Sequence, residues 1–134
     1  LQECITYSLT GTTTESKLSP TASPPAAAGG RCVTIVNPIS PDRAVMRTTL
    51  LPGLLEVAQR NLLAADAVSL FEIGAVYLPV KGDALPNEPR RLALVLCGRR
   101  SAAAWDDPLD KKPALFDFFD LKGVVQSLVA DLHV

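Results

Sequence analysis

The sequence has few of the residue types that most often build hydrolytic and metal sites. It contains one histidine, His133, at the very end of the chain, and three cysteines, Cys4, Cys32 and Cys97. A Ser-His-Asp or Cys-His mechanism needs a firmly positioned histidine, and a terminal residue is a poor candidate for that role. The cysteine count is odd and no CxxC pair occurs, which argues against a disulfide framework and a zinc site. We therefore expect three reduced, buried thiols and a solvent-facing His133.

Long hydrophobic runs and an excess of one charge are also missing. The apolar runs, such as Leu92–Cys97, fall far short of the roughly 20 residues that a membrane-spanning helix needs. No basic segment followed by an apolar one opens the chain, so we identify no signal peptide. The expected reduced cysteines are typical of a cytoplasmic protein. The 13 Lys+Arg and 14 Asp+Glu residues balance one another. This balance disfavours a strong non-specific nucleic-acid binder.

Motifs for binding phosphates or metals are absent from the sequence as well. Glycines such as Gly29-Gly30 form neither GxGxxG nor GxxxxGK[ST], the patterns of the common phosphate-binding loops. Five aspartates cluster over residues 106–120 without the spacing of a metal site, and they are Asp106, Asp107, Asp110, Asp117 and Asp120. We interpret them as a solvated loop and a helix cap. We predict no catalytic, cofactor-binding or metal-binding residue in this chain.

The chain does contain enough apolar material for one folded domain. Of its 134 residues, 48% are hydrophobic and 20% are charged, which is typical of globular proteins. It begins with leucine rather than methionine, which indicates a fragment or a processed piece. Residues 10–30 are rich in Thr, Ser, Pro, Ala and Gly and are predicted to form a flexible insertion. With an irregular loop over 98–116, we expect residues 1–134 to form a single partial domain.

Hydrophobic patterning predicts several strands. They cover residues 3–9, 33–36, 69–80 and 91–97, with a further extended stretch over 44–50. Residues 69–80 are mostly apolar on both faces, so this strand should be central in its sheet and buried. It is expected to form an antiparallel hairpin with 91–97.

Two amphipathic helices are predicted among these strands. The first opens near Pro52, because proline suits the first helical turn, and Thr49 is a candidate cap. The second covers 117–132, where Asp117 is the cap and Asp120 stands three residues later, as in a capping box. Helices interspersed with hairpin strands predict an α+β fold with a largely antiparallel sheet flanked by helices.

Glu72 is a carboxylate inside the strand predicted to be buried. Removing a charged group from water is costly, so a buried carboxylate needs a partner. Arg47 and Lys122 are both candidates for that partner. A structural ion pair is the interpretation that we favour.

Several colinear segments carry a more specific signal. They are QECITYSL (2–9), VNPIS (36–40), MRTTLLPGLL (46–55), RNL (60–62), LFEIGAVY (70–77), LPNEPRRLA (85–93) and FFDLKGVV (118–125). In this order they resemble the β-subunit family of bacterial-type phenylalanyl-tRNA synthetases. The resemblance covers nearly the whole chain outside the two irregular stretches, although the family has a shorter connection where this chain has residues 10–30.

The resemblance implies the synthetase-like core of that subunit, with the fold of a class II aminoacyl-tRNA synthetase. The core would be incomplete, because the family's core begins with a helix before residue 2 and continues beyond Val134. Structural roles are implied for the family-motif residues Pro38, Arg47, Pro52, Gly53, Glu72, Gly74, Asp120, Lys122 and Gly123. Among them, Arg47 and Glu72 are expected to form an ion pair, Gly74 to allow close approach, and Gly123 to permit tight packing.

The resemblance also implies that this chain lacks the catalytic activity of the related α subunit. The related catalytic α subunit activates phenylalanine with ATP, and class II chemistry needs an arginine after an aromatic residue in the second motif. Here Tyr77 is followed by Leu78 and Pro79. The chain would therefore be a catalytically silent part of phenylalanine-tRNA ligase that supports the α subunit and a second β subunit. It would meet tRNA(Phe) through the holoenzyme, with ATP and Mg²⁺ bound at the α subunit.

Two other functions remain open from the sequence. The first is an independent class II-like paralogue that binds a nucleotide or an amino acid, with Arg47 or Arg90-Arg91 as the phosphate cation. The second is a direct RNA-binding module. It has the least support, because the charges balance and the sequence shows no basic face interleaved with aromatic residues.

Overall fold

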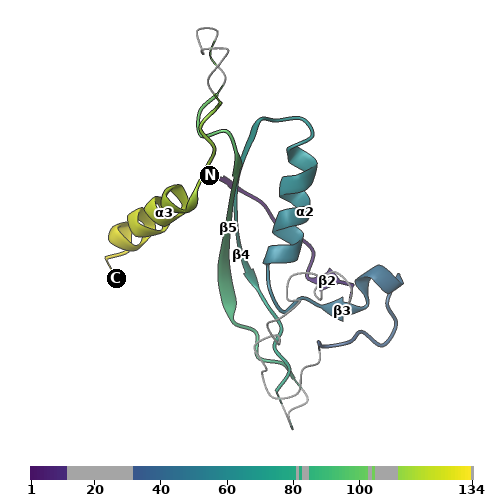
Figure 1. The fold of residues 1–134 in the computed structure, drawn as a ribbon. Coiled ribbons are helices and arrows are strands. Elements are labelled where there is room, and N and C mark those ends of the chain that lie inside the picture. Colours follow the sequence, from purple (N-terminus) through teal and green to yellow (C-terminus); the bar gives the residue numbers. More distant parts are fainter. Residues whose placement is uncertain (12–31, 81, 83–84, 103, 105–111, 134) are drawn as a thin grey trace.

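A computed structural model describes residues 1–11, 32–80, 82, 85–102, 104 and 112–133 of the chain. In chain order, its elements are β1 (Gln2–Glu3), β2 (Leu9–Thr10), the short 3-10 helix η1 (Pro41–Arg43), β3 (Val45–Met46), α2 (Leu51–Asn61), β4 (Ala67–Ala75), β5 (Arg90–Gly98) and α3 (Phe118–Asp131). They form an α+β arrangement, as predicted (Figure 1). The predicted insertion over 10–30 lies outside the described residues from residue 12 onward, and the loop over 98–116 does so in part.

The hairpin of β4 and β5 is the centre of the fold. The two strands pair antiparallel along their whole length, with Phe71 opposite Leu94. β1 adds to the other edge of β4, so the sheet has the order β1-β4-β5 and β4 is central, as predicted. The pairing of β1 with β4 is parallel, so the sheet is mixed, although most of its pairing is antiparallel. The chain passes through α2 between these two strands, and such a crossover is what joins parallel neighbours.

The strand predicted over residues 3–9 is instead two short strands in different sheets. β1 belongs to the main sheet, whereas β2 pairs antiparallel with β3 in a separate two-stranded sheet. Between them the backbone N–H of Thr6 donates to the side chain of Glu72 and not to a strand, so the ladder is interrupted. The strand predicted over 33–36 is reduced to one isolated bridge between Thr34 and Val45.

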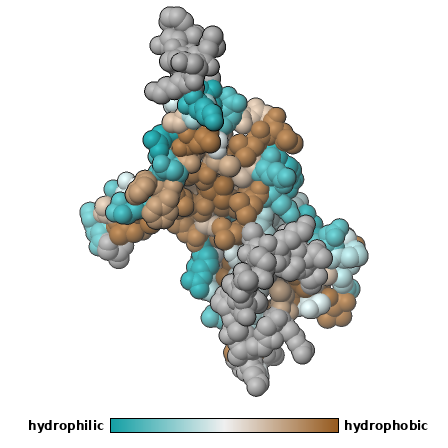
Figure 2. Space-filling model, viewed as in Figure 1, coloured by the Kyte–Doolittle hydropathy of each residue, from teal (hydrophilic) through white to brown (hydrophobic). Residues whose placement is uncertain are grey.

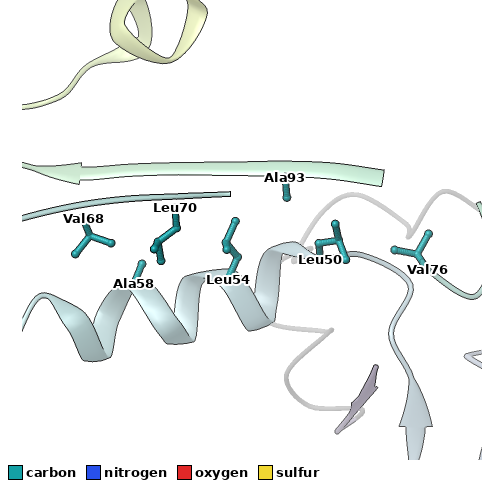
Figure 3. Close-up of a cluster of buried hydrophobic side chains, with 7 residues drawn as sticks. All are labelled: Leu50, Leu54, Ala58, Val68, Leu70, Val76 and Ala93. Atoms are coloured by element: carbon teal, nitrogen blue, oxygen red, sulfur yellow. The ribbon is translucent and has the colours of Figure 1, made fainter. Parts of the chain in front are cut away.

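Helix α2 covers one face of the sheet and creates the core (Figure 3). Pro52 lies in its first turn, as predicted, but the N-cap is Leu50 and not Thr49. Leu54 is fully buried between helix and sheet. The buried cluster consists of Leu50, Leu54, Ala58, Val68, Leu70, Val76 and Ala93. Burial of this apolar surface, at roughly 25 cal/mol per Å², is the main term that holds the helix to the sheet.

The opposite face of the sheet is only partly covered by the described residues. Leu70, on the α2 side of β4, is 5% exposed, whereas Ile73 on the other side is 48% exposed. The expectation that both faces of this strand are buried is therefore wrong for the part of the chain described here. β4 also ends at Ala75, earlier than the strand predicted over 69–80.

Helix α3 lies on the side of the sheet opposite to α2, as Figures 1 and 3 both show. The predicted capping box is present, with Asp117 as the N-cap and Asp120 as its reciprocal partner. None of the helix residues is buried. The apolar stripe that predicted this helix is thus not matched by a packed face.

The cysteines are less buried than predicted, whereas the histidine is exposed as predicted. Cys4, Cys32 and Cys97 are not paired with one another in a disulfide, and each is only half-buried. His133 follows α3, is exposed and has a φ of 54°. Its position beyond the last helical turn fits the predicted solvent-facing residue.

Candidate functional site

The most highly organised polar cluster of the described chain surrounds Glu72. This residue lies on the α2 side of β4 and is 1% exposed. Its Oε1 accepts a hydrogen bond from Arg47 Nη1 at 2.7 Å, which makes a buried ion pair. Thr6 donates twice more, from its backbone N–H to Oε1 at 3.2 Å and from its hydroxyl to Oε2 at 2.7 Å. The carboxylate therefore has the charge-assisted bonds that offset its removal from water.

Arg47 follows β3 and is held as tightly as its partner. Its Nε donates to the carbonyl of Ala75 at 2.9 Å, and its Nη1 donates to the Thr6 hydroxyl at 3.0 Å. The backbone of Arg47 also accepts from the N–H of Tyr77 and donates to the carbonyl of Ser8. One arginine thus joins the amino-terminal segment, the segment after β3 and the end of β4. The expected pair of Arg47 and Glu72 is present, and Lys122 is exposed on α3.

Two glycines make room for this cluster. A Cβ at Gly74 would meet the Nη2 atom of Arg47, and a Cβ at Gly53 would lie 2.7 Å from the Thr6 hydroxyl. The close approach expected at Gly74 is therefore seen, and Gly53 lets the amino-terminal segment cross the first turn of α2. Gly123 is different, because nothing lies within 4 Å of a Cβ built there. The expectation that Gly123 permits tight packing is wrong, since α3 presents this position to open space.

A shallow pocket of about 220 Å³ lies next to the cluster, between the amino-terminal segment and α2. Its wall includes Tyr7, whose ring stacks under the Arg43 guanidinium at 4.0 Å, a cation–π contact. Nearby, burial raises the pKa of the Cys4 thiol, and the negative charges of Glu72 and Glu3 raise it further. A raised pKa lowers the thiolate fraction, so this cysteine is a poor nucleophile.

A second polar cluster fixes the beginning of α3. Asp117 Oδ1 accepts from the backbone N–H of Phe119 at 2.8 Å, and Asp120 Oδ2 accepts from that of Asp117 at 2.9 Å. Arg100 Nη2 donates to both aspartates, at 3.1 Å and 2.9 Å. The backbone hydrogen bond from Asp117 holds the pKa of Asp120 below its usual value of 3.8, with a smaller contribution from Arg100. This geometry joins the end of β5 to the helix N-terminus.

Sequence reasoning found some members of these clusters and missed others. Thr6 gave no signal, because a threonine in a strand-like segment is ordinary. Arg100, which no sequence pattern singled out, bridges two carboxylates. Pro52 is buried in the first turn of α2, whereas Pro38 is exposed before η1.

The contacts of both polar clusters favour a structural role over a catalytic one. Within the described ranges, no group of three or more His, Cys, Asp or Glu residues could hold a metal ion. None of the described helices is long and apolar enough to cross a membrane. The charged side chains in both clusters are engaged with one another, so their observed contacts serve to join segments of the chain.

Comparison with known proteins gives a consistent result. A family profile described as "Phenylalanyl tRNA synthetase beta chain CLM domain" matches residues 1–134. The phenylalanine-tRNA ligase β subunit of Geobacter sulfurreducens is 49% identical over 98 residues, 72% of this chain and 12% of its own length. That of Symbiobacterium thermophilum is 40% identical over the whole chain and 14% of its length. That of Dehalococcoides mccartyi is 37% identical over 99% of the chain and 15% of its length. The chain thus spans less than a sixth of each of these relatives.

Proposed function

The chain belongs to the phenylalanyl-tRNA synthetase β-chain family, and on that premise we propose that it is a non-catalytic, synthetase-like core domain of the β subunit. Its function would be to support the α subunit and the assembly of the ligase that attaches phenylalanine to tRNA(Phe). The domain would be a single unit over residues 1–134, with an incomplete form of the class II synthetase fold. The buried state of Arg47 is the observation that carries this proposal.

Arg47 contacts the end of β4, yet its guanidinium is buried in an ion pair and is not presented to a ligand. Its side chain is 8% exposed and its Nη1 atom is 2.7 Å from the Glu72 carboxylate. An arginine that neutralises a nucleotide phosphate has to present its guanidinium to the ligand. Releasing Arg47 for that purpose would leave Glu72 buried without its counter-charge, which is strongly unfavourable.

The alternative cations, Arg90 and Arg91, are not placed to act together. They pair with Ala75 and Gly74 at the start of β5, and successive residues of a strand point to opposite faces. Arg91 therefore lies on the α2 side of the sheet and Arg90 on the other side. After Tyr77, where the resemblance to class II enzymes would place an arginine, the chain has Leu78 and Pro79. These observations favour the silent core over an independent nucleotide-binding paralogue.

The remaining parts of the proposal follow from the family. The partners would be the α subunit and a second β subunit, in a heterotetramer that binds tRNA(Phe). ATP and Mg²⁺ would bind at the α subunit, with no cofactor held by this chain. The location would be the cytoplasm, where translation takes place.

Adenylate formation tests the non-catalytic part of the proposal. The chain is incubated with ATP, Mg²⁺ and phenylalanine, and exchange of labelled pyrophosphate into ATP is followed, with an α/β holoenzyme as the positive control. We expect no exchange above the protein-free rate, and no saturable ATP binding by calorimetry. Stoichiometric ATP binding with adenylate formation would contradict the proposal. If Arg91→Gln then abolished that binding, the paralogue function would be favoured.

A further inference from the structure

Two apolar surfaces of the chain face the same region and neither is fully covered. The first is the face of the hairpin turned away from α2, hereafter the open face, formed by Phe71, Ile73, Leu92, Leu94 and Leu96. The second is the apolar stripe of α3, formed by Leu121, Val124, Val125, Leu128, Val129 and Leu132. In Figure 2 hydrophobic residues continue from α3 across the sheet. α3 stands on this side of the sheet and diverges from β5 (Figure 1).

The stripe residues of α3 nearest the junction are less exposed than the last one, Leu132, whereas Phe118 at the start of the helix is itself 70% exposed. On α3, Leu121 and Val124 in the first turns are half-buried, whereas Leu128 is 38% exposed and Leu132 is 63% exposed. On the open face, Leu96 near the end of β5 is half-buried, whereas Leu92 is 42% exposed. A helix packed along a strand would be covered evenly. The observed gradient is that of a wedge whose narrow end lies at the junction of β5 and α3.

The junction itself is held by polar contacts. The N–H of Phe116 donates to the carbonyl of Gly98 at 3.0 Å, and the N–H of Arg100 donates to that of Ala114 at 2.8 Å. Arg100 also bridges Asp117 and Asp120 at the helix N-terminus. These bonds fix the position of the first turn of α3. Among the described residues, no hydrogen bond joins the later turns of α3 to the sheet.

We propose that α3 is a hinged lid, which pivots at the Arg100 contacts and closes its apolar stripe over the open face of the hairpin. Closure would remove the exposed leucines of both surfaces from water, which is favourable roughly in proportion to the apolar area buried. The lengths of α3 and β5 are compatible with this closure. A helix of 14 residues is about 21 Å long, and a strand of nine residues is about 30 Å long. The helix therefore fits along the strand without passing its end. This inference does not depend on the proposed function.

Methyl NOEs on the chain labelled at Ile, Leu and Val test the closure. We expect intramolecular NOEs from Leu128 and Leu132 to Ile73 and Leu92, at the wide end of the wedge. NOEs confined to the narrow end, between Leu121 and Leu96, would overturn the lid. A sample mixed from two differently labelled preparations separates contacts between copies. If the wide-end NOEs appeared only between copies, a second chain would cover the face and the lid would again be overturned.

A matched pair of variants tests whether the apolar stripe of α3 causes the closure. Leu128→Glu places a charge in the stripe, and Gln126→Glu places the same charge in the same turn on the opposite side of the helix. We expect Leu128→Glu to abolish the wide-end NOEs and to keep those between Leu121 and Leu96, while Gln126→Glu leaves both sets unchanged. Loss of the wide-end NOEs in both variants would contradict closure by the apolar stripe. The wild-type NOEs remain a test in themselves if Leu128→Glu does not fold.

Discussion

At the scale of single residues, Glu72 and Arg47 decide how three distant segments meet. Neither residue is stable where it is without the other, because a lone buried charge costs several kcal/mol. With the other present, five hydrogen bonds among Thr6, Arg47 and Glu72 tie the amino-terminal segment to β4. We infer that the pair specifies the path of the chain between β1 and β2.

Glu72→Gln is expected to destabilise the chain strongly. The substitution leaves Arg47 buried with no counter-charge, and removing one partner of a buried pair costs about 3–5 kcal/mol. The measurement is the free energy of unfolding in urea. Glu56→Gln is the control, because Glu56 forms an exposed pair with Arg60 and should change stability by less than about 1 kcal/mol. An equal decrease in the free energy of unfolding in the two variants would show that the buried pair stabilises the chain no more than the exposed pair does.

Gly74→Ala is expected to destabilise the chain as well, by about 1–3 kcal/mol, because its Cβ would displace the Arg47 guanidinium. Gly123→Ala is the matched substitution on α3, where a Cβ meets open space. Alanine is favoured over glycine inside a helix by about 0.5–1 kcal/mol, so this variant should be more stable than wild type. Urea unfolding compares the two. If Gly74→Ala left the free energy of unfolding unchanged, the observed position of Arg47 would not be required for stability.

At this scale the sequence identifies which residue needs a partner but not which partner it has. A glutamate in an apolar strand signals an ion pair, yet Arg47 and Lys122 fit that signal equally. The choice depends on how the segment after β3 passes the end of β4, which is tertiary information. Arg100 was missed for the same reason, since its aspartates lie 17 and 20 residues further along the chain.

At the scale of elements, the start of α3 combines a capping box with an ion pair. The hydrogen bond from the Asp117 backbone and the charge of Arg100 both favour the ionised form of Asp120, so its pKa is lowered. A group with a lowered folded pKa contributes stability that is present above its unfolded pKa and is lost as the pH falls through the folded value. The contact should therefore be intact above pH 3.8 and weaken below it.

NMR titration of the Asp120 carboxyl carbon tests this assignment of causes. We expect a midpoint below 3.8 in wild type. In Arg100→Gln the midpoint should rise but stay below 3.8, because the backbone hydrogen bond is the larger cause. A midpoint that returns fully to 3.8 in Arg100→Gln would make the ion pair, and not the cap, the dominant cause.

The long elements could be predicted from the sequence and the short ones could not. α2, α3 and the β4–β5 hairpin follow from periodicity, because each spans enough residues to show its pattern. β1, β2 and β3 have two residues each, and their pairing is set by the Glu72 cluster and by the crossover through α2. The open face was also beyond prediction. A strand that is apolar on both sides shows that both sides need cover but not what provides it.

At the scale of the whole molecule, the chain is a sheet with one well-packed face and one poorly packed face. Its sequence matches the family profile over residues 1–134, yet it spans only 12–15% of the three relatives compared above. Apolar side chains outside the proposed lid are exposed as well, among them Ile5, Val36 and Ile39, and exposed apolar surface can mark a place of interaction. This property agrees with the proposal that the domain functions by supporting other subunits.

Sedimentation velocity of the chain, alone and mixed with the α subunit of a related bacterial phenylalanine-tRNA ligase, tests this proposal most directly. Each protein is also run alone, so that self-association is not mistaken for a complex. We expect a faster boundary in the mixture that contains both chains, in addition to the boundary of the free 14.2 kDa chain. Two independent boundaries, unchanged as the concentration of the α subunit is raised, would contradict a subunit-supporting role for this domain.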